Sequence, residues 1–394
     1  MDFRAFCAWI VLFLILSLTR DVTRHRHFSI QRGSSPPPPS LSPPWFDLCL
    51  SAILSQRAYL PPGKKEDDEF FRYVRGERYA ARMVSSDVRY FDAREIGRGF
   101  EHTNVYVWIS SSELRRHTDV DEYDGDVCSD FSLADVRTAY VVFRGTENLG
   151  DMLANLDVRT ACISVDDAEA CAKVHNGFLR QFQAVERPIL EYLRSKRNTY
   201  DRVVFTGHSL GGALATIAAV SYVCSNTGVE EKEALPQVVC HSFGSPRAGN
   251  IEFSEFFERV FRSRDTETET ETETERQHWR VFDYEDPVCM VPMSNRFHHV
   301  GSRGVCLGHG LDYKAEVDAE RESGKRPWYC RPFVSLLRID PVRPFQPHDM
   351  SRYVDKLKRL DRWTEKIRTT KTHNTTGCRP KEVNPRPFVR RSYR

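Results

Sequence analysis

The chain has 394 residues, of which 40% are hydrophobic and 28% are charged, which is the balance of a folded globular protein. This length is sufficient for one large domain or two smaller ones. The formal net charge is +2, and no basic stretch with interleaved aromatic residues lies in the middle of the chain. These properties argue against a nucleic-acid partner.

The N-terminal residues 5–18 (AFCAWIVLFLILSL) are apolar apart from Ser17. A helix of about 14 residues would extend roughly 21 Å, which is shorter than the ~30 Å hydrocarbon core of a bilayer. This length is typical of the apolar part of a secretory signal, which we assign to residues 1–20. No small-x-small cleavage site follows, so an uncleaved anchor that associates with a membrane through residues 5–18 stays open. Both interpretations direct the chain into the secretory pathway, as a secreted or membrane-anchored protein.

Three segments of biased composition are expected to lie outside the hydrophobic core. Residues 21–44 end in a run of prolines and serines (QRGSSPPPPSLSPP), which predicts an extended linker. Residues 266–275 (TETETETETE) predict a solvated loop, because five glutamates on one face of a strand would repel one another. Residues 364–394 are basic and poor in apolar runs, which predicts a disordered tail. The folded domain is therefore expected over 45–363.

Between these segments, apolar periodicity predicts strands that alternate with helices. Taken in chain order, the expected elements are a helix over 48–59, strands over 105–109 and 139–143, a helix over 177–193 that contains Pro188, a strand over 203–206, a helix over 210–223, a strand over 238–243, a helix over 251–261, a strand over 280–283 and a helix over 350–360. Several of the strands are apolar without alternation. This combination indicates an α/β fold with a mostly parallel central sheet and helices on both faces.

The chain contains eleven cysteines, of which Cys7 lies in the N-terminal apolar segment. The other ten are an even number, which is compatible with disulfides in an oxidising compartment. Cys162 and Cys171 bracket an acidic loop and are the best local candidates for a pair. No CxxC sequence is present, which argues against a zinc site. No metal or organic cofactor is expected.

The most informative motif is Gly207-His208-Ser209-Leu210-Gly211, a G-x-S-x-G sequence between a predicted strand and a predicted helix. In this context Ser209 is predicted to lie on a sharp turn as a nucleophile. The flanking glycines lack Cβ atoms, so the strand and the helix can approach closely. The backbone N–H of Leu210, at the helix N-terminus, is expected to stabilise an oxyanion. The alternative is a glycine-rich turn that carries a solvent-facing serine.

A serine nucleophile requires a histidine base and a carboxylate that orients the base, and in this type of fold the chain order is serine, acid, histidine. Asp286 directly follows a predicted strand and is the expected acid, although Asp283 and Glu285 are close neighbours. His299 and His348 both follow the acid. Their spacing does not decide which of them is the base.

Seven sequence blocks together resemble the class 3, or fungal-type, triacylglycerol lipases. In order they are VVFRGT (141–146), VHNGF (174–178), TGHSLGGALA (206–215), SFGSPRAGN (242–250), DPV with a following Val-Pro (286–292), FHHVG (297–301) and HDMSRYV (348–354). They span roughly residues 105–360, and it is their order that is specific. The resemblance implies an α/β-hydrolase fold and the hydrolysis of lipid esters at a lipid–water interface.

The resemblance also implies roles for individual residues. It assigns the base to His348, leaves His299 in a supporting role, and assigns a second oxyanion donor to the backbone N–H of Thr146. It places a helical lid after that residue. One apolar helix face with i, i+3, i+4 and i+7 spacing follows there, formed by Leu149, Met152, Leu153 and Leu156. The lid lacks the tryptophan often found in the family, and an ordinary core-facing helical turn is the alternative.

The function expected from these residues is that of a serine hydrolase with a Ser209–Asp286–His348 triad and an acyl-enzyme intermediate. Two alternatives stay open: a non-catalytic binding protein with the same fold, and an esterase that acts on soluble esters such as feruloyl esters. The sequence does not distinguish a triacylglycerol from a phospholipid or galactolipid substrate, and it points to no particular protein partner.

Overall fold

A computed structural model describes part of the chain. The described ranges are 43–63, 87–94, 103–109, 136–146, 159–163, 172–226, 236–261, 276–308 (except 284, 293, 295 and 302), 313–317 and 345–375. Several predicted features lie outside these ranges: the N-terminal segment 1–20, the linker up to residue 42, the threonine–glutamate run 266–275, Cys171, and the lid residues Leu149, Met152, Leu153 and Leu156. None of the helices in the described ranges combines the length and the apolar character needed to cross a bilayer.

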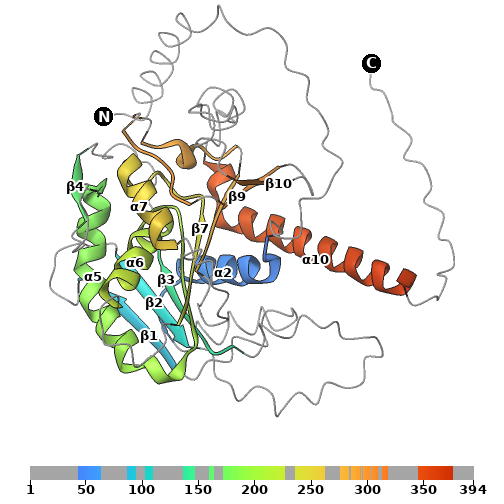
Figure 1. The fold of residues 1–394 in the computed structure, drawn as a ribbon, viewed down its shortest axis with the longest axis horizontal. Coiled ribbons are helices and arrows are strands. Elements are labelled where there is room, and N and C mark those ends of the chain that lie inside the picture. Colours follow the sequence, from blue (N-terminus) through green and yellow to red (C-terminus); the bar gives the residue numbers. More distant parts are fainter. Residues whose placement is uncertain are drawn as a thin grey trace, which may run out of the picture.

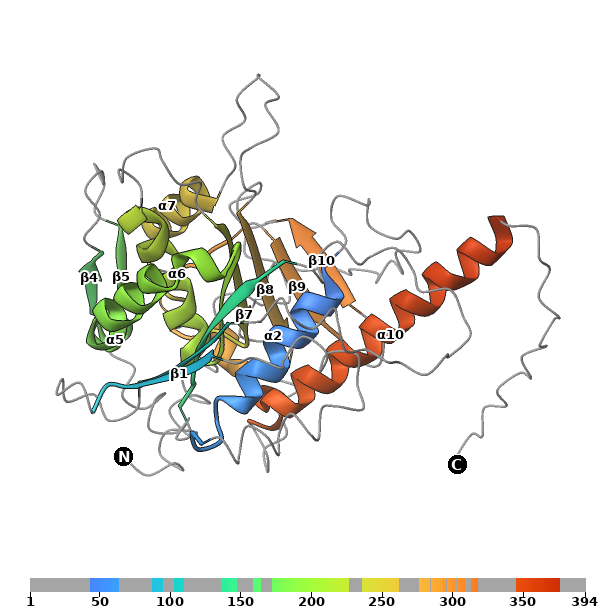
Figure 2. The same ribbon diagram turned by 90° about the horizontal axis from the view of Figure 1, so that it is seen from below.

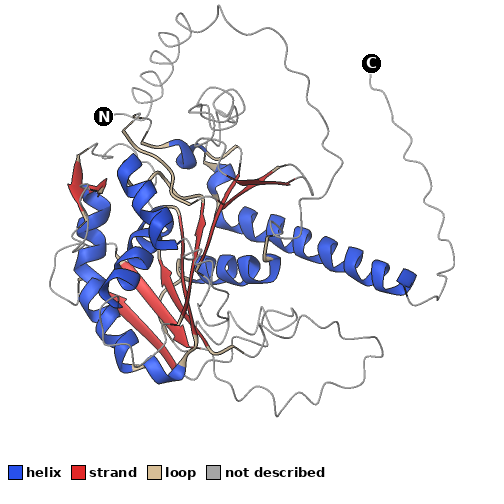
Figure 3. Cartoon of the chain, viewed as in Figure 1, coloured by secondary structure: helices blue, strands red, loops and turns tan. Residues whose placement is uncertain are grey.

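An eight-stranded sheet forms the centre of the molecule (Figure 1; strands are red in Figure 3). Its order is β1 (Asp87–Asp92), β2 (Asn104–Ile109), β3 (Thr138–Phe143), β6 (Arg202–His208), β7 (Gln237–Phe243), β8 (Gln277–Asp283), β9 (Arg303–Leu307) and β10 (Tyr313–Val317). The pairings from β3 to β9 are parallel, whereas β1, β2 and β3 pair in antiparallel fashion, as do β9 and β10. The sheet is therefore parallel in its centre and antiparallel at its edges.

Helices cover both faces of this sheet (Figures 1 and 2). One face is covered by α5 (Asn176–Ser195), α6 (Leu210–Asn226) and α7 (Ile251–Phe261), and the other by α2 (Trp45–Arg57) and α10 (Met350–Thr375). In β6, Phe205 belongs to the first core layer and Val204 to the second. Burial on both faces explains why the central strands are apolar without alternation. The expected α/β class, with the parallel-centred sheet of an α/β-hydrolase fold, is confirmed.

Short elements complete the described structure. β4 (Thr160–Cys162) and β5 (Lys173–His175) form a second, antiparallel pair. Three 3₁₀ turns, η5 (Arg197–Thr199), η6 (Pro287–Met290) and η8 (Gln346–His348), connect larger elements. The last two of these turns position the acidic and basic residues considered below.

The C-terminal boundary differs from the prediction. Helix α10 continues to Thr375, so the expectation of a disordered tail from residue 364 is wrong for residues 364–375. This stretch contains neither glycine nor proline, the residues that most often end a helix, so nothing in it stops the helix that begins at Met350. In both ribbon views the helix extends beyond the sheet that its first half covers (Figures 1 and 2).

The cysteines are only partly oxidised. Cys162 takes part in a disulfide. Cys49, Cys224, Cys240, Cys289 and Cys306 are thiols, and all of them except Cys224 are buried. Burial raises the pKa of the Cys240 thiol to about 12, which keeps it protonated and unreactive. The even number of cysteines therefore does not mean that all ten are paired.

A buried polar network attaches α2 to the sheet. The Asp47 carboxylate and the Arg202 guanidinium lie 2.8 Å apart, and both side chains are almost completely buried. One turn further along α2, Ser51 Oγ shares a 2.8 Å hydrogen bond with Nδ1 of His241. These contacts connect the first described helix to β6 and β7, the two strands that lead into the site.

Candidate active site

Ser209 lies between β6 and α6 in a backbone conformation that is rare for a residue with a side chain. Its φ is 57°, in the left-handed region, and no other non-glycine residue in the described ranges has a positive φ. Its backbone N–H donates a 2.9 Å hydrogen bond to the carbonyl of Phe243, the last residue of β7. The side chain is fully buried. A strained strand-to-helix turn of this kind is the expected setting for an activated serine.

The glycines around Ser209 are required by close backbone contacts. A Cβ atom on Gly207 would lie 2.4 Å from the carbonyl of Gly211. A Cβ atom on Gly211 would lie 2.2 Å from the carbonyl oxygen of Phe143. The two glycines therefore allow α6 to start directly against the ends of β3 and β6, as the sequence predicts.

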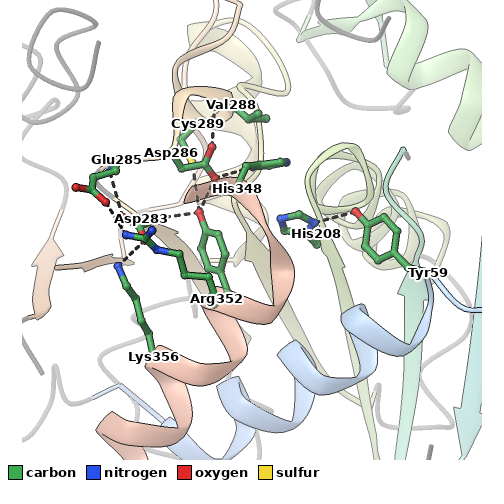
Figure 4. Close-up of polar contacts among 11 residues, drawn as sticks. Tyr59, His208, Asp283, Glu285, Asp286, Val288, Cys289, His348, Arg352 and Lys356 are labelled. Carbon is green, nitrogen blue, oxygen red and sulfur yellow. Dashed lines mark hydrogen bonds and ion pairs between the residues drawn. The ribbon is translucent and has the colours of Figure 1, made fainter. Parts of the chain in front are cut away.

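The predicted acid and base are in contact. Nδ1 of His348 lies 2.7 Å from Oδ2 of Asp286, and both side chains are buried (Figure 4). Asp286 caps the 3₁₀ turn η6, where its Oδ1 accepts a 2.8 Å hydrogen bond from the N–H of Val288. His348 ends η8 and is separated from the start of α10 at Met350 by one residue, Asp349. The carboxylate is thus fixed at one oxygen by backbone and presents the other to the imidazole.

Tyr353 adds a second contact to the same carboxylate oxygen. Its hydroxyl donates a 2.6 Å hydrogen bond to Oδ2 of Asp286 and accepts a 2.9 Å hydrogen bond from the N–H of Asp283. Burial, followed by the charge of Asp286, raises the pKa of Tyr353 well above its ordinary value. The phenol therefore stays protonated and can act as a permanent donor to the acid.

Ser209 and the Asp286–His348 pair meet at the carboxyl end of β7. Gly244, which follows that strand, has a φ of 54°, and a Cβ atom there would lie 2.8 Å from Oδ2 of Asp286 and 3.2 Å from Cε1 of His348. Within the described residues, neither Oγ of Ser209 nor Nε2 of His348 has a hydrogen-bond partner, although both atoms are buried. Contacts between a nucleophile and its base are commonly longer in the free protein than in a complex.

His299, the alternative base, is held elsewhere. Its Nε2 lies 2.7 Å from the carbonyl oxygen of Cys289, and its own carbonyl oxygen accepts a 2.9 Å hydrogen bond from Oγ of Ser254. Its ring therefore contacts the backbone of η6 while Asp286 contacts His348. This geometry is compatible with a supporting role for His299.

The other side of the His348 ring is occupied by His208. The two ring centroids are 4.4 Å apart and the planes are inclined by 32°. Nδ1 of His208 shares a 2.8 Å hydrogen bond with the hydroxyl of Tyr59, which follows α2. Burial, followed by the proximity of His348, lowers the pKa of His208 well below its ordinary value, so this imidazole is neutral at neutral pH. Figure 4 shows Asp286, His348, His208 and Tyr59 in sequence across the site.

The two predicted oxyanion donors lie at the ends of neighbouring elements. Leu210 is the first residue of α6, whose N-terminus carries partial positive charge. Thr146 is half-buried and follows Gly145 just beyond β3. Gly145 packs tightly against the site, because a Cβ atom there would lie 2.0 Å from the Tyr59 hydroxyl and 2.6 Å from the carbonyl of His208.

Asp286 lies in a loop that is attached to α10 by a group of charged side chains (Figure 4). Asp283 pairs with Lys356 and lies 3.3 Å from Nε of Arg352, which also pairs with Glu285. Burial raises the pKa of Asp283, although Lys356 opposes the shift. Asp283 and Glu285, the sequence alternatives for the acid, thus face the cationic side of α10 and not His348. Within the ranges that the structure describes, no group of three or more metal-ligating side chains occurs.

Sequence reasoning missed Tyr59, His208, Gly244 and Tyr353 as parts of this site. Tyr353 lies in the HDMSRYV block, five residues after His348, and this closeness was the available signal. Tyr59 and His208 are 149 positions apart, and nothing in the sequence connects them. Their contact depends on where α2 packs.

Known proteins resemble this chain over its central part. The family model of lipase (class 3) matches residues 140–296. Secreted mono- and diacylglycerol lipase 2 of Gibberella zeae is 34% identical over 123 residues, which cover 31% of this chain and 28% of that protein. A lipase of Rhizopus niveus is 29% identical over 141 residues, which cover 33% of each chain. The matched stretches therefore span less than half the length of these curated relatives.

Solved structures of lipases are also similar. Lipase II from Rhizopus niveus matches with a TM-score of 0.46 and 21% identity, covering 70% of this chain and 86% of that one. The Lip2 lipase of Yarrowia lipolytica matches with a TM-score of 0.49 and 17% identity, covering 77% of this chain and 92% of that one.

Proposed function

Since the family model of class 3 lipases matches residues 140–296, we propose that this chain is a serine hydrolase that cleaves the carboxylic ester bonds of acylglycerols or related lipids. The observation that carries the proposal is the buried 2.7 Å contact between His348 and Asp286 beside the strained turn at Ser209. These are the three side-chain types, in the chain order, that acyl transfer requires.

In the proposed mechanism, Nε2 of His348 takes the hydroxyl proton of Ser209 while Oγ attacks the ester carbonyl carbon. Asp286 accepts the hydrogen bond from Nδ1–H of His348, which leaves Nε2 as the basic nitrogen. The same carboxylate stabilises the imidazolium that forms. His348 then gives its proton to the leaving alcohol, and a water molecule releases the fatty acid from the acyl-serine along the same proton path.

The negative charge on the tetrahedral oxygen is assigned to the backbone N–H groups of Leu210 and Thr146. The N-terminus of α6 supplies the first donor together with its partial positive charge. Loss of one such donor typically costs on the order of 100-fold or more in rate. The predicted lid would control access to these groups, and its four apolar residues lie outside the described ranges.

The first experiment changes the nucleophile. The substitution Ser209→Ala is expected to abolish hydrolysis of a short-chain nitrophenyl ester and labelling by a fluorophosphonate, because no other group can form the acyl-enzyme. Circular dichroism and thermal unfolding serve as the controls for folding. Retained turnover or labelling in the folded variant would contradict the proposal.

The second experiment compares the two histidines. The substitution His348→Ala is expected to lower kcat by about four to six orders of magnitude, as loss of a triad member does. His299→Ala is expected to have a much smaller effect on kcat, because His299 contacts backbone at Cys289. A larger loss in His299→Ala than in His348→Ala would move the base to residue 299.

The substrate class is proposed from the same relatives. We assign acylglycerols on the grounds of the family match, and a lipid panel that includes phospholipids and galactolipids tests this choice. Faster turnover of monomeric than of emulsified esters would favour the soluble-ester alternative. A folded protein that neither turns over any ester nor reacts with the fluorophosphonate would favour the non-catalytic binding protein.

Secretion is proposed on two grounds: the apolar N-terminal residues 5–18 and a relative named as secreted. Expression of the full chain in a secreting host, followed by N-terminal sequencing of the product, tests cleavage after the segment proposed over 1–20. Recovery of the uncleaved chain with the membrane fraction would favour an anchor.

The proposed catalytic domain begins at residue 45 and includes α10.

A further inference from the structure

Of the two nitrogens of the His348 imidazole, one is hydrogen-bonded within the described residues. Asp286 fixes Nδ1, whereas Nε2 has no hydrogen-bond partner in the described part of the chain. A ring held at one nitrogen can rotate about that hydrogen bond unless something packs against its face. Within the site, His208 supplies such a contact at a centroid distance of 4.4 Å.

The position of His208 is in turn set by Tyr59. The 2.8 Å hydrogen bond between the Tyr59 hydroxyl and Nδ1 of His208 is the polar contact on the ring, whose Nε2 is buried without a partner in the described residues. His208 is also the residue directly before Ser209. Its ring lies between the ring of His348 and Tyr59, which follows α2 (Figure 4).

The Tyr59 hydroxyl also touches the proposed oxyanion segment. The two groups are so close that a Cβ atom on Gly145 would lie 2.0 Å from this oxygen, and the same Cβ atom would meet the carbonyl of His208 at 2.6 Å. Gly145 immediately precedes Thr146. One hydroxyl group thus contacts both the neighbour of the base and the backbone beside the second oxyanion donor.

The turn that carries Tyr59 is braced by buried groups. The guanidinium of Arg57 is fully buried and donates to the carbonyl of Leu60 at 3.2 Å and to the carbonyl of Pro61 at 3.1 Å. The hydroxyl of Tyr106 donates a 2.9 Å hydrogen bond to the same Leu60 carbonyl. Burial of a guanidinium is unfavourable unless it is hydrogen-bonded, so these hydrogen bonds both satisfy Arg57 and fix the turn that carries Tyr59.

We propose that Tyr59 and His208 form a positioning pair for acyl transfer: Tyr59 fixes the ring of His208 and the backbone at Gly145, and His208 supports the ring of His348. The inference rests on the proposed function of His348 as the base. It makes the end of α2 part of the catalytic arrangement, although the family match begins only at residue 140. Neither residue exchanges a proton or contacts the ester in this account.

The test removes the hydroxyl and keeps the ring. Tyr59→Phe is expected to lower kcat for a short-chain nitrophenyl ester about 10-fold, the equivalent of one lost hydrogen bond, with KM essentially unchanged. The rate of irreversible labelling by a fluorophosphonate should fall by the same factor. A purely structural role for Tyr59 would lower thermal stability without changing either rate constant.

Tyr200→Phe is the matched control. Tyr200 is buried, and its hydroxyl makes two hydrogen bonds, to the carbonyl of Leu193 at 3.0 Å and with the hydroxyl of Tyr222 at 3.2 Å. It precedes β6, whereas His208 ends that strand. The same chemical change there should lower stability and leave kcat and the labelling rate unaltered. Equal kcat in Tyr59→Phe and the wild-type protein, or a change confined to KM, would overturn the proposal.

A second variant makes the test independent of the folding of the first. His208→Phe keeps a ring against His348 but cannot bond Tyr59, so its kcat should resemble that of Tyr59→Phe. Each of the two substitutions removes the same hydrogen bond, the one between Tyr59 and His208. The kcat of the double variant should therefore be no lower than that of the slower single variant. Additive losses would show that the two residues act separately and would overturn the pair.

Failure of the inference differs from failure of the proposed function. If the wild-type protein reacts with the fluorophosphonate and hydrolyses the ester while both pair variants keep its kcat, the positioning pair is wrong and the serine hydrolase stands. If the folded wild-type protein does neither, the proposed function itself has failed.

Discussion

At Gly211, helix α6 packs directly against the backbone at the end of β3. Helix propensity alone favours alanine over glycine in a helix by about 1 kcal/mol. Packing predicts the opposite, because a methyl group there would lie 2.2 Å from the carbonyl oxygen of Phe143. Both sides of this contact are backbone, and a shift of α6 away from Phe143 would also displace Ser209, which directly precedes that helix. The requirement for glycine is therefore spatial and local to the nucleophile.

We predict that Gly211→Ala lowers the free energy of unfolding and the rate of ester hydrolysis together. Urea denaturation and nitrophenyl ester turnover measure the two effects. Gly304→Ala is the control, since the nearest atoms to a Cβ at that position are 3.5 Å away, an ordinary contact distance. A Gly211→Ala variant that is more stable than the wild-type protein would show that propensity outweighs the contact.

Helix α2 is held on the sheet by apolar packing and by one buried ion pair. Asp47 and Arg202 are 2.8 Å apart, with side-chain exposures of 5% and 2%. Removing one partner of such a pair leaves the other charge buried and uncompensated. The arrangement fixes where α2 packs, and through its last turn it fixes where Tyr59 reaches the site.

Asp47→Ala is expected to lower the free energy of unfolding by about 3–5 kcal/mol, because Arg202 would remain buried without its carboxylate. Arg137→Ala provides a matched change in a pair that is largely exposed, Arg137 with Asp201. That substitution should cost only about 0–1 kcal/mol. Similar losses in the two variants, measured by urea denaturation, would mean that the Asp47–Arg202 pair is not the main attachment of α2.

The helices and strands that could be predicted from the sequence were those with long or periodic runs of apolar residues. The long helices and the central strands were found because their apolar runs are continuous, and α7 was predicted with its observed bounds of 251–261. The edge strands β1 and β10 were missed, as were β4, β5 and β9. β4 and β5 have only three residues each, too few for a periodic pattern, and β1 contains two aspartates and an arginine.

The candidate site also contains some residues that could be predicted from the sequence and others that could not. Ser209 and the glycines around it could be predicted from a contiguous motif in a strand-to-helix context. The contact of Asp286 with His348 could not be predicted from spacing, which left His299 open, and followed only from resemblance to a family. The contacts of Tyr59 and Tyr353 depend on the packing of α2 and α10 and have no linear pattern.

At the scale of the whole molecule, buried histidines link stability to pH. Burial is the main cause that lowers the pKa of His241 and of His278 to about 3 each. An unfolded histidine has a pKa of about 6.5, so between these values the unfolded chain binds protons that the folded chain does not. Stability is therefore complete above this window and is lost as the pH falls through it.

We expect the free energy of unfolding to fall between pH 7 and pH 5 by about 2 kcal/mol for each of these two histidines. Urea denaturation at the two pH values measures the difference. His278→Gln removes one titrating group, and the fall in this variant should be about 2 kcal/mol smaller than in the wild-type protein. An unchanged pH dependence would mean that His278 is protonated or solvated in the folded chain.

The two helices on one face of the sheet, α2 and α10, come from opposite ends of the described chain and lie against each other (Figures 1 and 2). During translation, therefore, the aromatic layer formed by residues such as Tyr106, Trp108 and Tyr140 is only half covered until the last helix leaves the ribosome. A nascent chain that ends before His348 also lacks its imidazole. The proposed ester hydrolysis therefore requires α10 and the turn before it to be complete, and a chain truncated before His348 is expected to be inactive and prone to aggregation.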